Sequence, residues 1–381
     1  MTILTHIWSV AAYIVPFIFV LSLVVFFHEF GHFIVGRWCG VKVDAFSLGF
    51  GPEICHFNDR HGTRWRIGAL PLGGYVKFHG DANGASMTDV DAAAVMSSED
   101  RAVSFFAQKV WKRAAIVAAG PVANFLLAIV IFTGIFYVSG RGMLAPLVDN
   151  VSAGSAAEAA GFEPGDLILS IDGRKIESFE DMQRVVQTAS DDALTFAVDR
   201  QGRTIELVAT PRRREIKTPF GTTSVGVLGV ETRAKPENWR VQRYGLAESF
   251  TRATSETWYV VARTGSYLGG LVTGRESADQ LSGPIRIAEV SGEMAKIGIA
   301  ALLNLTAILS ISVGLLNLLP IPLLDGGHLF YYAVEAARGR AMGEKAQEFG
   351  FRIGLTLVAG LMIFATYNDI LRLTRQLMGW G

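Results

Sequence analysis

Long uncharged runs dominate the pattern of hydrophobic and polar positions along the 381-residue chain. Four runs contain no Asp, Glu, Lys or Arg: residues 7–27, 114–138, 298–324 and 353–368. A helix needs about 20 apolar residues to cross the hydrocarbon core of a bilayer, so the first three runs qualify by length. The fourth reaches that length only by including Asp369. The pattern therefore predicts four membrane-spanning helices and excludes a purely soluble protein.

Positive charges next to these runs predict how the chain crosses the membrane. The loop between the first two runs carries Arg37, Lys42, Lys109, Lys112 and Arg113 near its ends, and the loop between the last two carries Arg338, Arg340, Lys345 and Arg352. Loops rich in Lys and Arg stay in the cytoplasm. We expect both loops to be cytoplasmic, and both termini and the polar middle of the chain to be periplasmic in a bacterial inner membrane.

The first loop carries its own β pattern. Residues 41–78 consist of short apolar and β-branched stretches separated by Gly-Pro at 51–52 and Gly-Gly at 73–74, which are turn signals. These stretches predict membrane-associated β segments within a loop of residues 37–112.

The polar middle of the chain begins with a compact β-rich pattern. Gly161–Gly165 reads as a turn, Asp172-Gly173 is a hairpin-turn pair, and residues 179–189 have apolar positions at helical spacing. The run EAAGFEPGDLILSIDGRKI resembles the core of a PDZ domain of the bacterial protease type. We expect one such domain over residues 143–232, and residues 236–296 have a pattern to which we assign no fold.

The predicted fold class is thus a multi-pass α-helical membrane protein with four transmembrane helices, a membrane-associated β-hairpin loop and one periplasmic PDZ domain. The predicted segments are a first helix at 1–36, the loop at 37–112, a second helix at 113–139, the PDZ domain at 143–232, the unassigned segment at 236–296, a third helix at 297–325, a loop at 326–350 and a fourth helix at 351–371.

Composition adds three exclusions. The chain is 50% hydrophobic and only 18% charged, and its formal net charge of zero gives no reason to expect a nucleic-acid partner. Two cysteines, Cys39 and Cys55, cannot make a disulfide framework. Because no Lys or Arg precedes Arg37, the first run lacks the basic start of a signal peptide, and we expect it to remain as a helix.

The candidate chemistry begins at the end of the first apolar run, in the sequence His28-Glu29-Phe30-Gly31-His32. Two histidines at i and i+4 lie on one helix face, where both imidazoles can reach one metal ion, and Glu29 beside them can act as a general base. The alternative is a chance cluster at a membrane interface, satisfied by headgroups and water. Ionisable groups in an apolar helix are costly, which favours a functional site.

A carboxylate at the end of the third apolar run can complete the site. Pro320 and Pro322 prevent a regular helix before Asp325, and irregular backbone at membrane depth is tolerated only inside protein or beside a water-filled cavity. By the predicted topology, Asp325 lies on the same side of the membrane as His32.

Together, HEFGH and NLLPIPLLDGGH resemble the site-2 protease family of intramembrane zinc metalloproteases, and the order of parts resembles its regulator of sigma-E protease type. SLGFGP, LPLGGYVKF, AAGPVANF and SGPIRIAE agree with this resemblance, which covers essentially the whole chain. It departs from the pattern in one respect, since only one PDZ signature is present.

The resemblance implies one zinc ion held by His28, His32 and Asp325, with Glu29 as general base and acid. It implies that Asn317, in the NxxPxP motif, and Gly73 and Gly74 lie near the bound substrate strand; a helix-capping or packing role for Asn317 remains open. His328 is expected to be a bystander. Gly120, Pro121 and Asn124 match the second-helix motif and are interpreted as structural residues.

The implied substrates are single-pass membrane proteins, such as anti-sigma factors or remnant signal peptides, already shortened by an upstream periplasmic protease. The lipid bilayer is the other expected partner. Two rival hypotheses are a membrane zinc transporter or sensor and a non-catalytic scaffold that presents the PDZ domain. The first leaves Glu29 without a role, and the second does not explain Asp325.

Overall fold

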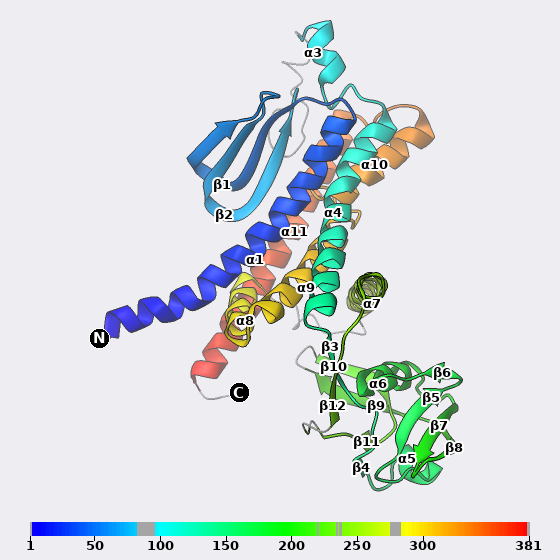
Figure 1. Cartoon of the computed structure of the whole chain (residues 1–381). Helices are drawn as coiled ribbons and strands as arrows, with labels where there is room; N and C mark the ends of the chain where they lie inside the picture. The colour runs from blue at the N-terminus through cyan, green and yellow to red at the C-terminus, as the bar shows by residue number, and fades with distance from the viewer. Residues whose placement is uncertain are drawn as a thin grey trace. The chain divides into compact units, whose positions relative to one another are not determined.

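The computed structural model describes residues 2–81, 96–218, 221–233, 235, 238–274 and 283–378 (Figure 1). The chain divides into two units. The first comprises Met1–Gly134, Phe250–Ser266 and Leu281–Gly381, and the second comprises Ile135–Ser249 and Tyr267–Gln280.

Four helices are long and apolar enough to cross a membrane. They are α1 (Thr2–Trp38), α4 (Val110–Val138), α9 (Ile299–Asn317) and α11 (Glu344–Leu377). Their apolar spans are Ala11–Trp38, Val110–Val138, Ile299–Asn317 and Lys345–Thr374. Because apolar helices of this length satisfy all their backbone hydrogen bonds internally, they agree with the predicted membrane protein.

The third predicted helix is shorter than its apolar run. Helix α9 ends at Asn317, and regular helix resumes only at α10 (Asp325–Arg338). Between them lie Pro320 and Pro322, which lack the backbone N–H that a continuing helix needs. The first part of the segment expected to be a loop at 326–350 is therefore helical. An ion pair of 2.6 Å between Arg113 and Glu335 joins α10 to the start of α4.

The segment 236–296, to which the sequence pattern assigned no fold, contains helices α7 (Leu246–Val272) and α8 (Pro284–Ile297). Helix α8 packs against α1, α9 and α11. Asp369 of α11 accepts hydrogen bonds from the backbone N–H groups of Gly283 (3.1 Å) and Arg286 (2.9 Å), and so caps the first turn of α8. Part of this segment is thus integral to the helical unit.

The loop after α1 forms two long antiparallel strands, β1 (Val43–Asn58) and β2 (Arg64–Phe78), rather than three short ones (Figure 1). Both strands bend, so four segments lie side by side in the order 74–78, 43–48, 64–67 and 55–58. Glycines with positive φ at Gly49, Gly51 and Gly73 allow these bends.

This sheet is anchored on α1 by aromatic side chains. Phe46 is 2% exposed, and its ring lies 5.6 Å from that of Phe33 in α1 and 4.3 Å from that of Trp65. The apolar contacts of Val76 and Phe78 fix the edge segment 74–78 beside α1.

The second unit contains a four-stranded sheet in the order β6-β5-β7-β8, formed by Arg174–Lys175, Leu167–Ile171, Leu194–Arg200 and Arg203–Ala209. Its core gathers around Ile168, Phe196 and Val198, against the buried face of α6 (Phe179–Thr188). Short helix α5 spans Ala156–Ala160. The remaining strands form three two-stranded pairs: β3 (Arg141–Leu144) with β12 (Trp239–Gln242), β4 (Asn150–Val151) with β11 (Val230–Glu231), and β9 (Arg212–Thr218) with β10 (Gly221–Val227).

Candidate metal centre

Helix α1 presents the two histidines of the HExxH sequence to the same point. His28 and His32 are one helical turn apart, and their Nε2 atoms lie 3.3 Å from each other. Their rings meet edge to face, with centroids 4.8 Å apart. Both residues lie inside the apolar span Ala11–Trp38.

Asp325 brings a carboxylate to these two imidazoles. It is the first residue of α10, and its Oδ2 atom lies 3.2 Å from His28 Nε2 and 3.6 Å from His32 Nε2. The ligand atoms of all three residues lie within 4.8 Å of one another. Among the described residues, this is the only group of three or more His, Cys, Asp or Glu side chains so arranged.

The donor set fits a zinc ion. Asp325 Oδ2 is buried and accepts no hydrogen bond of good geometry, although two imidazole nitrogens face it. A buried carboxylate oxygen without a donor is costly unless a cation meets it. Two imidazoles and one carboxylate with a further position open are a ligand set typical of catalytic zinc sites.

Backbone and side-chain groups of α4 orient both imidazoles. His32 Nδ1 lies 2.9 Å from the carbonyl oxygen of Ile116, which can only accept, so Nδ1 carries the proton and Nε2 keeps its lone pair. His28 Nδ1 lies 3.2 Å from the side-chain amide of Asn124. Asn124 Oδ1 is buried without a partner, so the amide turned by 180° would accept a hydrogen bond from the Nδ1–H group of His28. Both Nε2 atoms would then be free to bind the metal.

Two glycines let α1 and α4 approach closely enough for these contacts. A Cβ atom at Gly120 would lie 2.5 Å from His32 Cε1 and 2.9 Å from His28 Cε1. A Cβ atom at Gly31 would lie 2.8 Å from the carbonyl carbon of Ala119. From the sequence, Gly120 and Asn124 are interpreted as structural residues. The structure shows in addition that both lie directly beside the two histidines.

Glu29 faces the edge segment of the sheet. The backbone N–H of Val76 is directed at its carboxylate. Gly74 lies against the same side chain, since a Cβ atom there would be 3.0 Å from Glu29 Cγ and 2.9 Å from a methyl group of Val25. Its neighbour Gly73 has φ +133°, a conformation that other residues rarely adopt, and packs beside the Phe50 ring.

Asn317 and His328 are not members of the ligand group. Asn317 is the half-buried last residue of α9 and makes no side-chain hydrogen bond to His28, His32 or Asp325. His328, one turn after Asp325, does not belong to the ligand group and lies beside Tyr332, with ring centroids 6.5 Å apart.

The irregular segment before Asp325 is fixed by close backbone contacts. Leu323 has φ +112°, which costs a non-glycine residue about 1–3 kcal/mol and needs support from its surroundings. Gly327 packs on the backbone of the same segment, with a would-be Cβ 2.7 Å from Pro322 Cα. Gly354 of α11 supports it from the other side, since a Cβ atom there would lie 2.5 Å from the carbonyl carbon of Pro322.

Two histidines and a carboxylate in a buried cluster, with a glutamate beside them and apolar helices around them, define the class of membrane-embedded zinc peptidases. Comparison with known proteins agrees with this class. The family model described as Peptidase family M50 matches residues 16–361. The chain belongs to this family, that of the site-2 proteases, and is a zinc metalloprotease.

Individual relatives match along nearly the whole chain. A protein of Agrobacterium fabrum named as a zinc metalloprotease is 50% identical over 370 residues, which cover 97% of this chain and 98% of the relative. The metalloprotease MmpA of Caulobacter vibrioides is 42% identical over 382 residues, covering 94% and 95%. A protein of Rickettsia conorii with a similar name is 34% identical over 363 residues, covering 94% and 98%.

Proposed function

We propose that this metalloprotease hydrolyses peptide bonds within the transmembrane segments of single-pass membrane proteins, after a first cut outside the membrane. Intramembrane proteolysis is the general activity of its family. The observation that carries the proposal is the position of the metal ligands, because His28 and His32 lie inside an apolar span rather than in a soluble domain.

The proposed roles follow from the geometry. His28, His32 and Asp325 would hold the zinc ion, which when bound polarises a peptide carbonyl and makes water a stronger acid. Glu29 accepts a proton from the attacking water and returns it to the amine of the departing chain. The Ile116 carbonyl, and the Asn124 amide once turned by 180°, would hold the two imidazoles in the tautomer that leaves Nε2 free.

The edge segment 74–78 offers a place for the substrate. A transmembrane helix hides its carbonyl groups in its own hydrogen bonds, so the substrate must become extended before attack. An extended chain can bind by adding a strand to a sheet edge. Gly73 and Gly74 keep side chains away from this edge beside Glu29, which supports their assignment to substrate binding. Asn317, the last residue of α9, is proposed for the same role on the resemblance alone.

Unit 2 would select the substrate. We infer that residues 143–232 form a PDZ domain, because helix α6 and strand β10 lie against each other, with Gly226 beside the Val186 carbonyl, as in domains that bind peptide ends next to a helix. Together with the segment 236–296, this domain would exclude proteins not yet shortened by an upstream periplasmic protease. Deleting residues 143–232, with a flexible linker in their place, should then permit cleavage of uncut substrates.

The proposed location is a bacterial inner membrane, with both termini in the periplasm and the active site near the cytoplasmic side. Arg37 near the end of α1 and Lys112 and Arg113 at the start of α4 support this orientation. Labelling of single cysteines placed at 338–345 and in 143–232 tests it, since only the latter should react from the periplasmic side.

A Glu29→Gln variant of the full-length protein tests the function. Zinc content should stay at one ion per chain while hydrolysis of a membrane substrate falls by at least ~100-fold, because the general base is lost and the ligands are not. His28→Ala should lose the zinc, and His328→Ala, a matched change outside the ligand group, should keep both zinc and activity. Full turnover by Glu29→Gln, or stoichiometric zinc in His28→Ala, would refute the assignment.

A further inference from the structure

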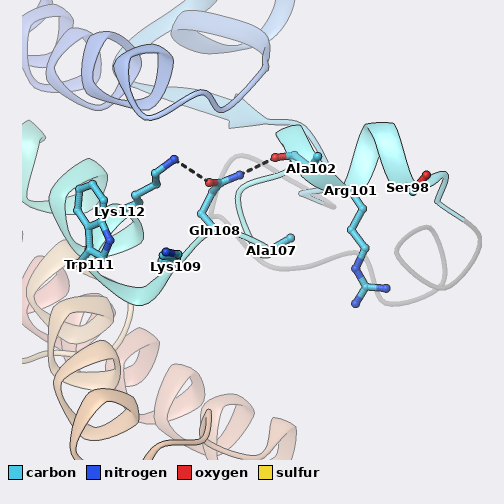
Figure 2. A pocket seen from close by; sticks show the side chains of 8 residues that line it. All are labelled: Ser98, Arg101, Ala102, Ala107, Gln108, Lys109, Trp111 and Lys112. Carbon is cyan, nitrogen blue, oxygen red and sulfur yellow. Dashed lines mark hydrogen bonds between the residues drawn. The ribbon is translucent and has the colours of Figure 1, made fainter.

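A basic cavity lies outside the metal centre, between the short helix α3 (Ser98–Val103) and the start of α4 (Figure 2). Its volume is about 570 Å³. The lining residues are Ser98, Arg101, Ala102, Ala107, Gln108, Lys109, Trp111 and Lys112. We propose that this cavity binds the phosphate headgroup of an anionic phospholipid.

The cavity lies at the end of two membrane-length helices. Lys109 directly precedes the span Val110–Val138, and the Lys112 ammonium group donates a hydrogen bond of 2.7 Å to the carbonyl of Cys39, the residue after α1. The end of α1 and the start of α4 are therefore at one level. Two tryptophans mark this level, since Trp38 is 77% exposed and Trp111 is 63% exposed. Exposed tryptophans at helix ends are typical of the headgroup layer of a bilayer.

Two cations of the cavity are available for a ligand. Within the described part of the chain, neither Arg101 nor Lys109 forms an ion pair or donates a side-chain hydrogen bond. The acidic residues of α3 do not line the cavity, and Asp100 instead accepts a hydrogen bond from Ser97 and approaches His79. A pair of cations without an acidic partner among the described residues, placed at a membrane surface, attracts anionic lipid.

The cavity is also held in shape without a ligand. The Gln108 amide donates to the carbonyl of Ala102 at 2.8 Å and its oxygen lies 3.4 Å from Lys112 Nζ, as Figure 2 shows. These contacts join α3 to the first turn of α4, so the two segments that carry the cations are held together before binding. Lys and Arg side chains next to the end of a transmembrane helix attract anionic lipid headgroups. A lipid also uses Trp111, which a free phosphate ion would leave exposed.

The test is lipid binding by the full-length protein in neutral detergent micelles, measured by native mass spectrometry with phosphatidylglycerol as the probe. The wild type should retain one tightly bound phosphatidylglycerol, and phosphatidylcholine should not replace it. The double variant Arg101→Gln/Lys109→Gln should weaken this binding roughly 30-fold, because it removes the attraction of two cations near the membrane surface.

Two controls separate this site from general charge effects. The variant Arg338→Gln/Arg340→Gln removes the same charge from the end of α10 and the loop after it, and should bind as the wild type does. Soluble glycerol phosphate at millimolar concentration should leave the lipid in place; displacement by it would indicate a free-phosphate site instead. Equal binding by the wild type and the Arg101→Gln/Lys109→Gln variant, or equal loss in both double variants, would overturn the proposal.

Discussion

Helix α11 supplies none of the three metal ligands, yet the structure predicts that its packing sets the position of one of them, Asp325. Gly354 packs on Pro322, three residues before Asp325. Replacing Gly354 with Ala would put a methyl carbon 2.5 Å from the carbonyl carbon of Pro322 and closer still to its oxygen, whereas ordinary contacts begin at 3.4 Å. Neither partner is the flexible end of a side chain, so the backbone of one element must move.

The required movement is large on the scale of a metal site. The difference between 2.5 and 3.4 Å alone requires about 1 Å of separation between α11 and the segment before Asp325, and the closer carbonyl oxygen requires more. Metal–ligand distances tolerate only about 0.2 Å. The segment has little freedom to absorb the change, because Pro322 fixes its own φ and Leu323 is already at φ +112°. A 1 Å misplacement of a catalytic group can cost roughly 100-fold in rate.

The assay compares two alanine variants of one helix in the full-length protein. Gly354→Ala should lower zinc affinity, measured by competition with a chelator, and reduce turnover roughly 100-fold. Gly360→Ala is the matched control, because nothing lies within 4 Å of a Cβ atom at that position. It should keep zinc and activity and gain up to about 1 kcal/mol in stability from helix propensity. Wild-type zinc affinity in a folded Gly354→Ala protein would refute the idea that α11 positions Asp325.

Two further predictions concern other contacts. Asn124→Ala should weaken zinc binding roughly 10- to 100-fold, because it removes the side-chain partner of His28. Ser310→Ala is the control and should keep zinc affinity, because it removes only a 2.9 Å hydrogen bond to the backbone carbonyl of Asn124. Equal loss of zinc affinity in both variants would indicate a packing defect instead. In unit 2, burial alone would raise the pKa of Asp166, but hydrogen bonds from Arg200 at 2.7 and 2.8 Å and from the Glu163 N–H lower it below the ordinary 3.8. The stabilisation is present above pH 3.8 and is lost as the pH falls through the lower folded pKa. Hydrogen exchange of strands β5 and β7 in the full-length protein should show this loss, and Asp166→Asn should cost about 2 kcal/mol at neutral pH and flatten the pH dependence.

Local patterns were enough to predict the elements that carry the site. Spacing alone put His28 and His32 on one helix face, and the two prolines indicated where the backbone before Asp325 leaves the helix. These features depend on neighbouring residues in sequence, which is why they could be read without a structure. The four membrane-length helices were predictable for the same reason.

Contacts between distant elements were not predictable in this way. The partners of the two imidazoles, Ile116 and Asn124, lie 84 and 96 residues from the histidines that they orient. One signal was present, since Gly120 and Asn124 are four residues apart and share a helix face, as His28 and His32 do. The packing of helix α8 against α1, α9 and α11 was also not predictable, because the pattern of apolar positions in a helix does not show which other helices it contacts.

Small residues explain how the metal centre is assembled in a membrane. Between helices surrounded by lipid the hydrophobic effect gives little attraction, so close backbone contact and hydrogen bonds must hold them together. Gly31 and Gly120 bring α1 against α4, Gly314 brings α9 against Pro121 of α4, and Gly354 brings α11 against the segment before Asp325. The HExxH sequence supplies only two of the three ligands. The position of the third relative to them is set by these glycine contacts, so the metal centre is a property of helix packing as much as of its own motif.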